Sequence, residues 1–511
     1  MTRLSFAVTD EIDQHEEVEI ALKQLDATMR NQEEKFSLAK ESWLLFSIAM
    51  PAVAVQFSVL FIFPQTASTV GRQLGTEALA GFSLASLTGN LTILSVMVGA
   101  LTAADTLMPR AFGTGSYKEM ARLAVRAFVM CTLLLIPPII PLFTTMEWIF
   151  EKLGQDPVAS KLASQWIRVY LLGVPAMLCF RVAQSFLNAQ HVVMPLVTAS
   201  IISCFLVHPL LLRWIVPALG FVGSGVAVTV TQTLMAILVF LYMYIKPEHH
   251  PETWPALSLK FWKESLQPRP VAQFMTLSLG GVLSLSEWWF WETNCFIVGS
   301  FGIVPLCVHT IAYNLVPLLF MIPLGISIGL TVRMGTVLAT DVPRAKKMAA
   351  WCMGFTIIVG GIVSSVLYLS RVPIVLLFTN DPEVLQGCVD IWPKLCVYVF
   401  ILYIFGINSA ILRALGMQWH VAAIVFGICW FLALPTIVYF SIYRGGGLDA
   451  IWTILPFFYI VMQVLLVMCY MNCSWEDIGQ GIREEHLKRQ NSINKGETDA
   501  EKAVHEETPL L

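Results

Sequence analysis

The sequence has few charged residues. Only 13% of its 511 residues are Asp, Glu, Lys or Arg, about half the share that a soluble globular domain carries. Hydrophobic residues make up 56% of the chain, and the mean hydropathy is +0.70. The net charge of −3 is too small to indicate the basic surface of a nucleic-acid-binding protein. The composition therefore excludes a soluble domain and predicts that most of the chain is embedded in a lipid bilayer.

Motifs for metal binding and for enzyme catalysis are also lacking. The 11 cysteines lie mostly inside apolar blocks, and no CxxC spacing occurs, so neither a metal site nor a disulfide framework is expected. No nucleophile and base stand at a recognisable spacing, as a membrane-embedded acyltransferase or protease would need. We expect no cofactor, and the chain is not predicted to be an enzyme.

Long apolar blocks are abundant and predict an all-α polytopic membrane protein. Each block is long enough for a helix to cross about 30 Å of hydrocarbon, and the short alternating segments of a β-barrel do not occur. We predict twelve transmembrane helices, at 43–67, 78–106, 119–145, 160–186, 193–218, 222–246, 271–299, 303–330, 345–370, 384–412, 419–442 and 449–471.

These helices divide into two halves with internal pseudo-symmetry. A polar segment at 247–270 separates an N-lobe at 43–246, helices 1–6, from a C-lobe at 271–471, helices 7–12, and similar motifs recur about 225 residues apart. Such a repeat predicts two six-helix bundles flanking a central binding site. Lys and Arg concentrate in the tails, 1–42 and 472–511, and in the loops on their side, so both termini are predicted to be cytoplasmic.

The deepest charges are two glutamates in the seventh predicted span. Glu287 and Glu292 lie in "SLSEWWFWETNCF" with Trp288 and Trp291, and an ionisable group at that depth is a functional candidate. A spacing of five residues places the two carboxylates roughly 140° apart on a helix, so they are not expected to share one proton. A carboxyl group in apolar surroundings binds a proton readily, and the indole faces attract organic cations. The segment therefore predicts exchange of a proton for a cation, although one glutamate bonding a neighbouring helix is the structural alternative.

Other polar residues within spans are weaker candidates. His309, Asn314 and Asn408 belong to the same half as the glutamates and are predicted to line the substrate and proton site. Hydrogen bonding between helices is the alternative for each. Asp390 and Lys394 are four residues apart and predict an ion pair within one helix.

Several of these segments resemble the multidrug and toxic compound extrusion (MATE) transporters, in particular the eukaryotic branch. The carrying motifs are "GTEALAGFSLASLTGN", "ADTLMPRAFGTGSYKEM", "FMIPLGISIGLTVRMGTVLATDVPRAKK" and "EWWFWE", the last similar to the eukaryotic EWW-x-x-E. The resemblance spans roughly 43–470 and implies a MATE-like fold of two six-helix bundles. It also implies alternating access and antiport of organic cations, related metabolites or xenobiotics against protons. The family's coupling glutamate falls on Glu287, with Glu292 as its companion.

The sequence departs from the family pattern at four positions. Pro305, Asn314 and Leu402 stand where mammalian members often carry glutamates, and Gln65 stands where bacterial sodium-type members often carry aspartate. The seventh span thus keeps the main coupling candidates, and a proton gradient is expected to drive transport rather than sodium.

The expected partners are a small organic cation or metabolite, protons and the lipid bilayer, with the chain acting as a monomer. The final "EETPLL" resembles an acidic dileucine signal, so an endosomal, lysosomal or vacuolar membrane is expected beside the plasma membrane. A lipid-linked oligosaccharide flippase of similar architecture and a passive channel remain the alternative functions. The residues also leave open the substrate's identity, the coupling stoichiometry and which glutamate carries the proton.

Overall fold

A computed structural model describes residues 38–152, 155–256, 258–376 and 382–484 of the chain. These residues form helices, eleven of which are long and apolar enough to cross a membrane. The predicted seventh span is the exception, because it consists of α12 (Pro268–Ser284) and α13 (Ser286–Gly299), joined at Leu285. Two short helices in series therefore replace the single helix that the sequence predicted at 271–299.

The N-lobe runs from α2 to α10. Its elements are α2 (Leu38–Leu74), α3 (Thr76–Gly89), the π-helical η1 (Asn90–Leu94), α4 (Ser95–Gly113), α5 (Tyr117–Thr144), α6 (Met146–Lys152), α7 (Pro157–Ala189), α8 (Met194–Ile201), the π-helical η2 (Ile202–Val207), α9 (His208–Leu219) and α10 (Phe221–Ile245). The interior of this lobe is one hydrophobic core to which most of these helices contribute.

The C-lobe runs from α12 to α20. After α12 and α13 it contains α14 (Ile303–Val337), α15 (Val342–Leu369), α16 (Arg371–Leu376), α17 (Pro382–Ala414), α18 (Gln418–Phe426), the π-helical η4 (Gly427–Ala433), α19 (Leu434–Val438), the π-helical η5 (Tyr439–Tyr443) and α20 (Gly447–Met471). Helical residues 475–484 follow. A second core, centred on α17 and α20, fills this lobe.

Backbone features repeat between the two lobes as the sequence repeat predicts. The π-helical turn η2 precedes Pro209, and η4 precedes Pro435, about 225 residues later. Gly220 and Gly445, at equivalent positions, have φ angles of 63° and 72°, which are strained for residues with a side chain. The predicted internal pseudo-symmetry thus extends to the details of the helix breaks.

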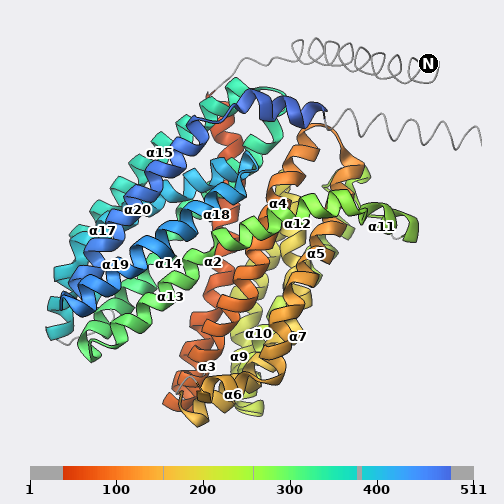
Figure 1. Cartoon of the computed structure of the whole chain (residues 1–511). Helices are drawn as coiled ribbons and strands as arrows, with labels where there is room; N and C mark the ends of the chain where they lie inside the picture. The colour runs from red at the N-terminus through yellow and green to blue at the C-terminus, as the bar shows by residue number, and fades with distance from the viewer. Residues whose placement is uncertain (1–37, 153–154, 257, 377–381, 485–511) are drawn as a thin grey trace, which may run out of the picture.

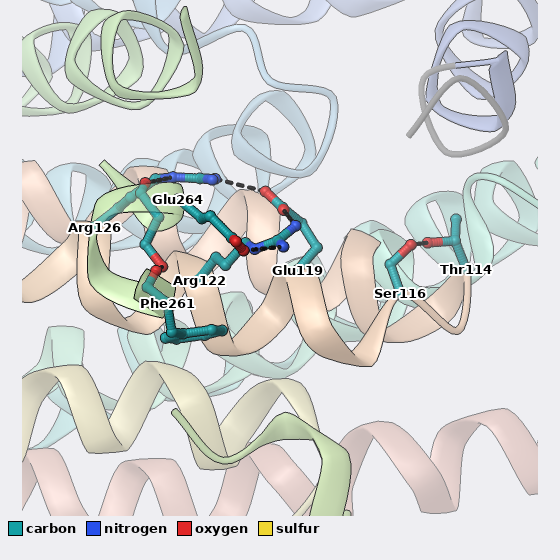
Figure 2. A network of polar contacts seen from close by, with 8 residues as sticks. Thr114, Ser116, Glu119, Arg122, Arg126, Phe261 and Glu264 are labelled. Carbon is teal, nitrogen blue, oxygen red and sulfur yellow. Dashed lines mark hydrogen bonds and ion pairs between the residues drawn. The ribbon is translucent and has the colours of Figure 1, made fainter. Parts of the chain in front are cut away.

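The segment between the lobes is attached to the N-lobe. It contains the 3-10 turn η3 (Pro251–Thr253) and α11 (Leu259–Ser265). Figure 2 shows the polar contacts that hold α11 against α5: Arg126 donates to the carbonyl oxygen of Ser265 at 2.6 Å, and Arg122 donates to Glu264 at 3.0 Å. Arg126 also pairs with Glu119 of its own helix at 2.5 Å. The contacts described here attach α11 to the N-lobe, ahead of the helices of the C-lobe.

The two lobes approach most closely near one face of the molecule. We call it the tail face, because α2 begins there and α20 ends there. The ribbons of the lobes lie together at this face and diverge toward the opposite one (Figure 1). A glycine permits the approach: a Cβ atom on Gly113, at the end of α4, would lie 2.1 Å from the carbonyl oxygen of Thr336. Deeper in the molecule, a Cβ atom on Gly281 of α12 would lie 1.9 Å from Thr102 Oγ1 of α4.

Candidate functional site

The break between α12 and α13 places Glu287 in the first turn of α13, facing α20. Glu287 is only 7% exposed. The hydroxyl of Tyr459 donates to Glu287 Oε1 at 2.6 Å, and the indole Nε1 of Trp291 donates to the Tyr459 hydroxyl at 3.2 Å. Both rings thus orient a single carboxylate oxygen through a chain of two hydrogen bonds.

Buried rings surround this chain, and we call them the aromatic cluster: Trp291 of α13, Tyr398 of α17, and Trp452 and Tyr459 of α20. The ring centroids of Trp291 lie 5.1 Å from Tyr398 and 6.0 Å from Trp452, and Tyr398 packs edge-on against Tyr459 at 4.8 Å. Tyr398, Trp452 and Tyr459 are almost completely buried. One carboxylate therefore stands among ring faces that favour a cation or a neutral, protonated acid.

Glu292 has a separate environment. It is half-buried, and its carboxylate accepts a hydrogen bond from the hydroxyl of Tyr313 in α14. Glu287 and Glu292 therefore bind different tyrosines on different helices, in agreement with the spacing argument that they would not form a shared-proton dyad.

The neighbouring tryptophans of α13 point in different directions. Trp288 is half-buried and makes none of the ring contacts described for the aromatic cluster. Trp289, which the sequence analysis did not single out, donates from its indole nitrogen to the carbonyl oxygen of Leu91 in η1 at 3.1 Å. Helix α13 thus contacts the N-lobe through Trp289 and the rest of the C-lobe through Glu287.

Among the weaker candidates, the structure brings only His309 to the cluster. Its ring is buried, 5.7 Å from Trp452 and 6.3 Å from Trp291 between centroids. Asn314 is exposed and donates to the Thr310 carbonyl of its own helix.

Asn408 is buried elsewhere in the C-lobe. It lies about 15 Å along α17 from Tyr398, where it donates to Gln463 and accepts from Tyr470. Neither asparagine reaches the aromatic cluster, so the structure leaves both outside the candidate site.

The predicted ion pair within α17 is wrong. Lys394 pairs with Asp449 at the start of α20, and Asp390 instead accepts a hydrogen bond from Gln386. An exposed pair at i, i+4 contributes only a few tenths of a kcal/mol, so a carboxylate supplied by a neighbouring helix displaces it easily.

Sequence reasoning missed the tyrosines that hold both glutamates, Tyr313 and Tyr459, and the buried rings Tyr398 and Trp452. One signal was available, because a phenol buried in an apolar span needs a hydrogen-bond partner and few acceptors exist there. The sequence gave no means to pair Tyr459 with Glu287, however, since 172 residues separate them.

Comparison with known proteins places the chain in a family. The MatE family model matches residues 51–213 and 281–439, with one match in each lobe. The chain belongs to the MatE family. The recognition from the sequence motifs is thereby confirmed, and the chain is a membrane transporter rather than an enzyme.

Similar proteins share most of the chain. An uncharacterised transporter of Schizosaccharomyces pombe is 28% identical over 84% of this chain and 78% of its own. Human multidrug and toxin extrusion protein 1 is 28% identical over 84% of this MatE-family chain and 73% of its own. The crystal structure of the eukaryotic MATE transporter AtDTX14 superposes with a TM-score of 0.80, at 21% identity, over 88% of this chain and 99% of that one. This similarity confirms the predicted fold of twelve helices in two bundles.

Proposed function

We propose that this MatE-family transporter is a secondary active antiporter that exports organic cations, related metabolites or xenobiotics in exchange for protons. The observation that carries the proposal is Glu287, a buried carboxylate held by Tyr459 within the aromatic cluster. The relatives named for multidrug and toxin extrusion support the same substrate class.

The chemistry of exchange follows from competition at one charged group. A proton and an organic cation each neutralise the Glu287 carboxylate, and a charge left unpaired there is costly. The site therefore favours occupation by one of the two at all times. Transport also requires that the relative affinities of the site for the proton and the cation differ between two states of access. Movement of α13 between its N-lobe and C-lobe contacts would supply this difference.

The direction of export depends on orientation. Lys and Arg concentrate on the side of the tails, so we assign the tail face to the cytoplasm. Because the lobes are closed at this face, the structure corresponds to an outward-facing state, from which substrate would be released on the side opposite the cytoplasm. The assignment to the plasma membrane or to an endosomal, lysosomal or vacuolar membrane stays a prediction, because "EETPLL" lies outside the described residues. The monomeric state and proton coupling also stay predictions.

The nature of the site argues against both alternative functions. A lipid-linked oligosaccharide flippase must bind phosphate groups, for which Arg or Lys is the usual partner, whereas the charged group that the aromatic cluster binds is the carboxylate of Glu287, and the nearby Lys394 is paired with Asp449. A passive channel has no requirement for a buried proton-binding group.

Proteoliposomes with an imposed pH gradient test the proposal. We expect wild-type protein to accumulate a fluorescent organic cation when the interior is acidic, and Glu287→Gln to lose this accumulation, because the amide binds neither a proton nor a cation strongly. Glu77→Gln, at an exposed position of α3, serves as the matched control and should transport normally. Equal uptake by wild type and Glu287→Gln, both monodisperse, would contradict the role of Glu287.

The half-buried position of Glu292 predicts a milder phenotype and separates the two glutamates. Glu292→Gln is expected to retain gradient-driven uptake with altered substrate affinity. If Glu292→Gln rather than Glu287→Gln abolishes coupling, the proton-binding role belongs to Glu292.

A further inference from the structure

Two arginines occupy equivalent positions of the repeat at the tail face. Arg110 lies in the last turn of α4, and Arg333 lies near the end of α14, about 225 residues later. Each precedes the turn that leads into the next span of its own lobe. Both side chains cross to the opposite lobe, so the two contacts are related by the same pseudo-symmetry as the lobes.

The first contact runs from the N-lobe to the C-lobe. The Nε and Nη2 atoms of Arg110 both donate to the carbonyl oxygen of Ala414, at 3.2 and 2.5 Å, where α17 ends. The turn that follows contains Gly416, with a φ of 76°, and a Cβ atom there would lie 3.0 Å from Arg110 Nη2. A glycine at this position therefore leaves room for the guanidinium.

The second contact runs from the C-lobe to the N-lobe. Arg333, 8% exposed, donates to Glu41 Oε2 of α2 at 2.9 Å, and its Nη1 lies 3.5 Å from Nε2 of His191. His191 lies in the turn between α7 and α8, at the position equivalent to Gly416, and with a φ of 61° it is the non-glycine residue with positive φ in the described chain. Arg344 of α15 binds the second oxygen of Glu41.

Both contacts must break before the lobes can separate at this face. The backbones of the lobes are closely apposed between them, since a Cβ atom on Gly335 would lie 2.8 Å from Cβ of Pro109. A buried guanidinium that loses its acceptors without gaining water is strongly disfavoured. Opening therefore requires water or substrate to replace Ala414 and Glu41 as partners.

We propose that Arg110 and Arg333 are paired gating residues that hold the tail face closed. Arg110 binds the end of the fourth span of the C-lobe, and Arg333 binds Glu41 of α2 beside His191, in the turn after the fourth span of the N-lobe. This role goes beyond exchange at Glu287 and rests on the proposed function only in that the lobes separate at this face during transport. The pairing also accounts for the small or strained residue at each receiving turn.

Amide hydrogen–deuterium exchange in detergent or nanodiscs, without substrate or gradient, tests the gate directly. The receiving turns at 188–193 and 412–417 report opening, because their amides are hydrogen-bonded in the closed state. We expect Arg110→Met and Arg333→Met, which keep an apolar stem, each to raise exchange in both turns by about threefold or more. Arg444→Met is the matched control, since Arg444 is exposed and contacts Tyr439.

A second variant guards against misfolding of the arginine mutants. Glu41→Gln preserves side-chain volume, removes the charge that Arg333 binds, and is expected to raise exchange at 188–193. The proposal would be overturned if Arg110→Met, Arg333→Met and Glu41→Gln all showed the same amide exchange in these turns as the wild type and Arg444→Met. An increase with only one of the two arginine variants would overturn their pairing. Because no transport is measured, these outcomes are independent of the role of Glu287.

Discussion

A single hydroxyl distinguishes the environment of Glu287 from a simple apolar pocket. Tyr459 donates to one carboxylate oxygen and receives a hydrogen bond from Trp291, so the carboxylate is oriented before any ligand arrives. Hydrogen bonds to a charged group contribute more than neutral ones. In the proposed exchange, Tyr459 would thus act through Glu287, as a positioning residue for cation binding.

Removal of this hydroxyl should weaken cation binding. We expect Tyr459→Phe to raise the KM for a transported cation roughly tenfold, corresponding to about 1.5 kcal/mol for a hydrogen bond to a charged group, with a smaller change in kcat. Tyr398→Phe is the matched control, because Tyr398 is equally buried in the cluster and the structure shows no hydrogen bond from it to Glu287. Equal KM values for the two variants would argue against positioning by Tyr459.

His191 provides a pH-sensitive group at the tail face. Burial, aided by the positive charge of Arg333, lowers the pKa of His191 from 6.5 to about 4. The groups that face it are Arg333 of α14, Glu41 of α2 and the ring of Phe112 in α4. A neutral imidazole accepts a hydrogen bond from the guanidinium of Arg333, whereas a protonated imidazole would repel it.

Acid should therefore weaken the closed tail face through His191. A lowered pKa means that the folded, closed form binds fewer protons than the unfolded chain. The contribution of neutral His191 to the free energy of unfolding is therefore complete above about pH 6.5 and is lost as the pH falls toward 4. At pH 5 the loss is at most about 2 kcal/mol. Thermal unfolding at pH 7.5 and 5 should show a smaller acid-induced drop in Tm for His191→Gly than for wild type. His191→Asn, which also tolerates positive φ, should behave like His191→Gly. An unchanged acid-induced drop in both variants would contradict the prediction.

At the residue scale, the sequence identified candidates where the signal is local, and their role in binding stays a prediction. Glu287, Trp291 and His309 were selected because charged or aromatic groups in apolar spans stand out without knowledge of their partners, and the structure brings them together. Asn314 stood out for the same reason yet is exposed and bonds its own helix, since the orientation of a side chain about its helix depends on packing that composition does not encode.

At the scale of elements, the sequence predicted the spans but not their interruptions. Apolar length fixes where a helix crosses the membrane, whereas a π-helical turn depends on local hydrogen bonding. Pro209 has no N–H, so the carbonyl oxygen of Cys204, five residues earlier in η2, loses its helical partner. Gln65 of α2 donates to that oxygen at 3.2 Å. Gln65, which stands where bacterial sodium-type members often carry aspartate, thus has a structural role in this chain.

The break at Leu285 has a structural consequence that the sequence did not reveal. It separates α12, which packs closely on α4 through Gly281, from α13, which carries Glu287 and Trp289. The serines on either side of Leu285 favour helix ends over helix interiors, which explains the position of the break after the fact. The sequence alone predicted a continuous span because every residue around the break is compatible with the membrane.

At the scale of the whole molecule, the repeat determines both the architecture and the closure. The weak similarity between halves predicted two bundles, and the structure adds that the lobes meet at the tail face through pseudo-symmetric contacts of Arg110 and Arg333. These contacts join residues about 300 positions apart and follow only from the relative placement of the lobes. The candidate exchange site lies within one lobe, so the closure and the site occupy separate parts of the molecule.

In the proposed antiport, cation movement and proton movement are obligatorily opposed. The most direct test loads proteoliposomes with a pH-sensitive dye, imposes no gradient, and adds an organic cation outside. We expect that wild-type protein exports protons as the cation enters, so that the interior becomes alkaline, and that Glu287→Gln does not. Cation entry without a change in internal pH, in protein that transports, would contradict proton-coupled antiport.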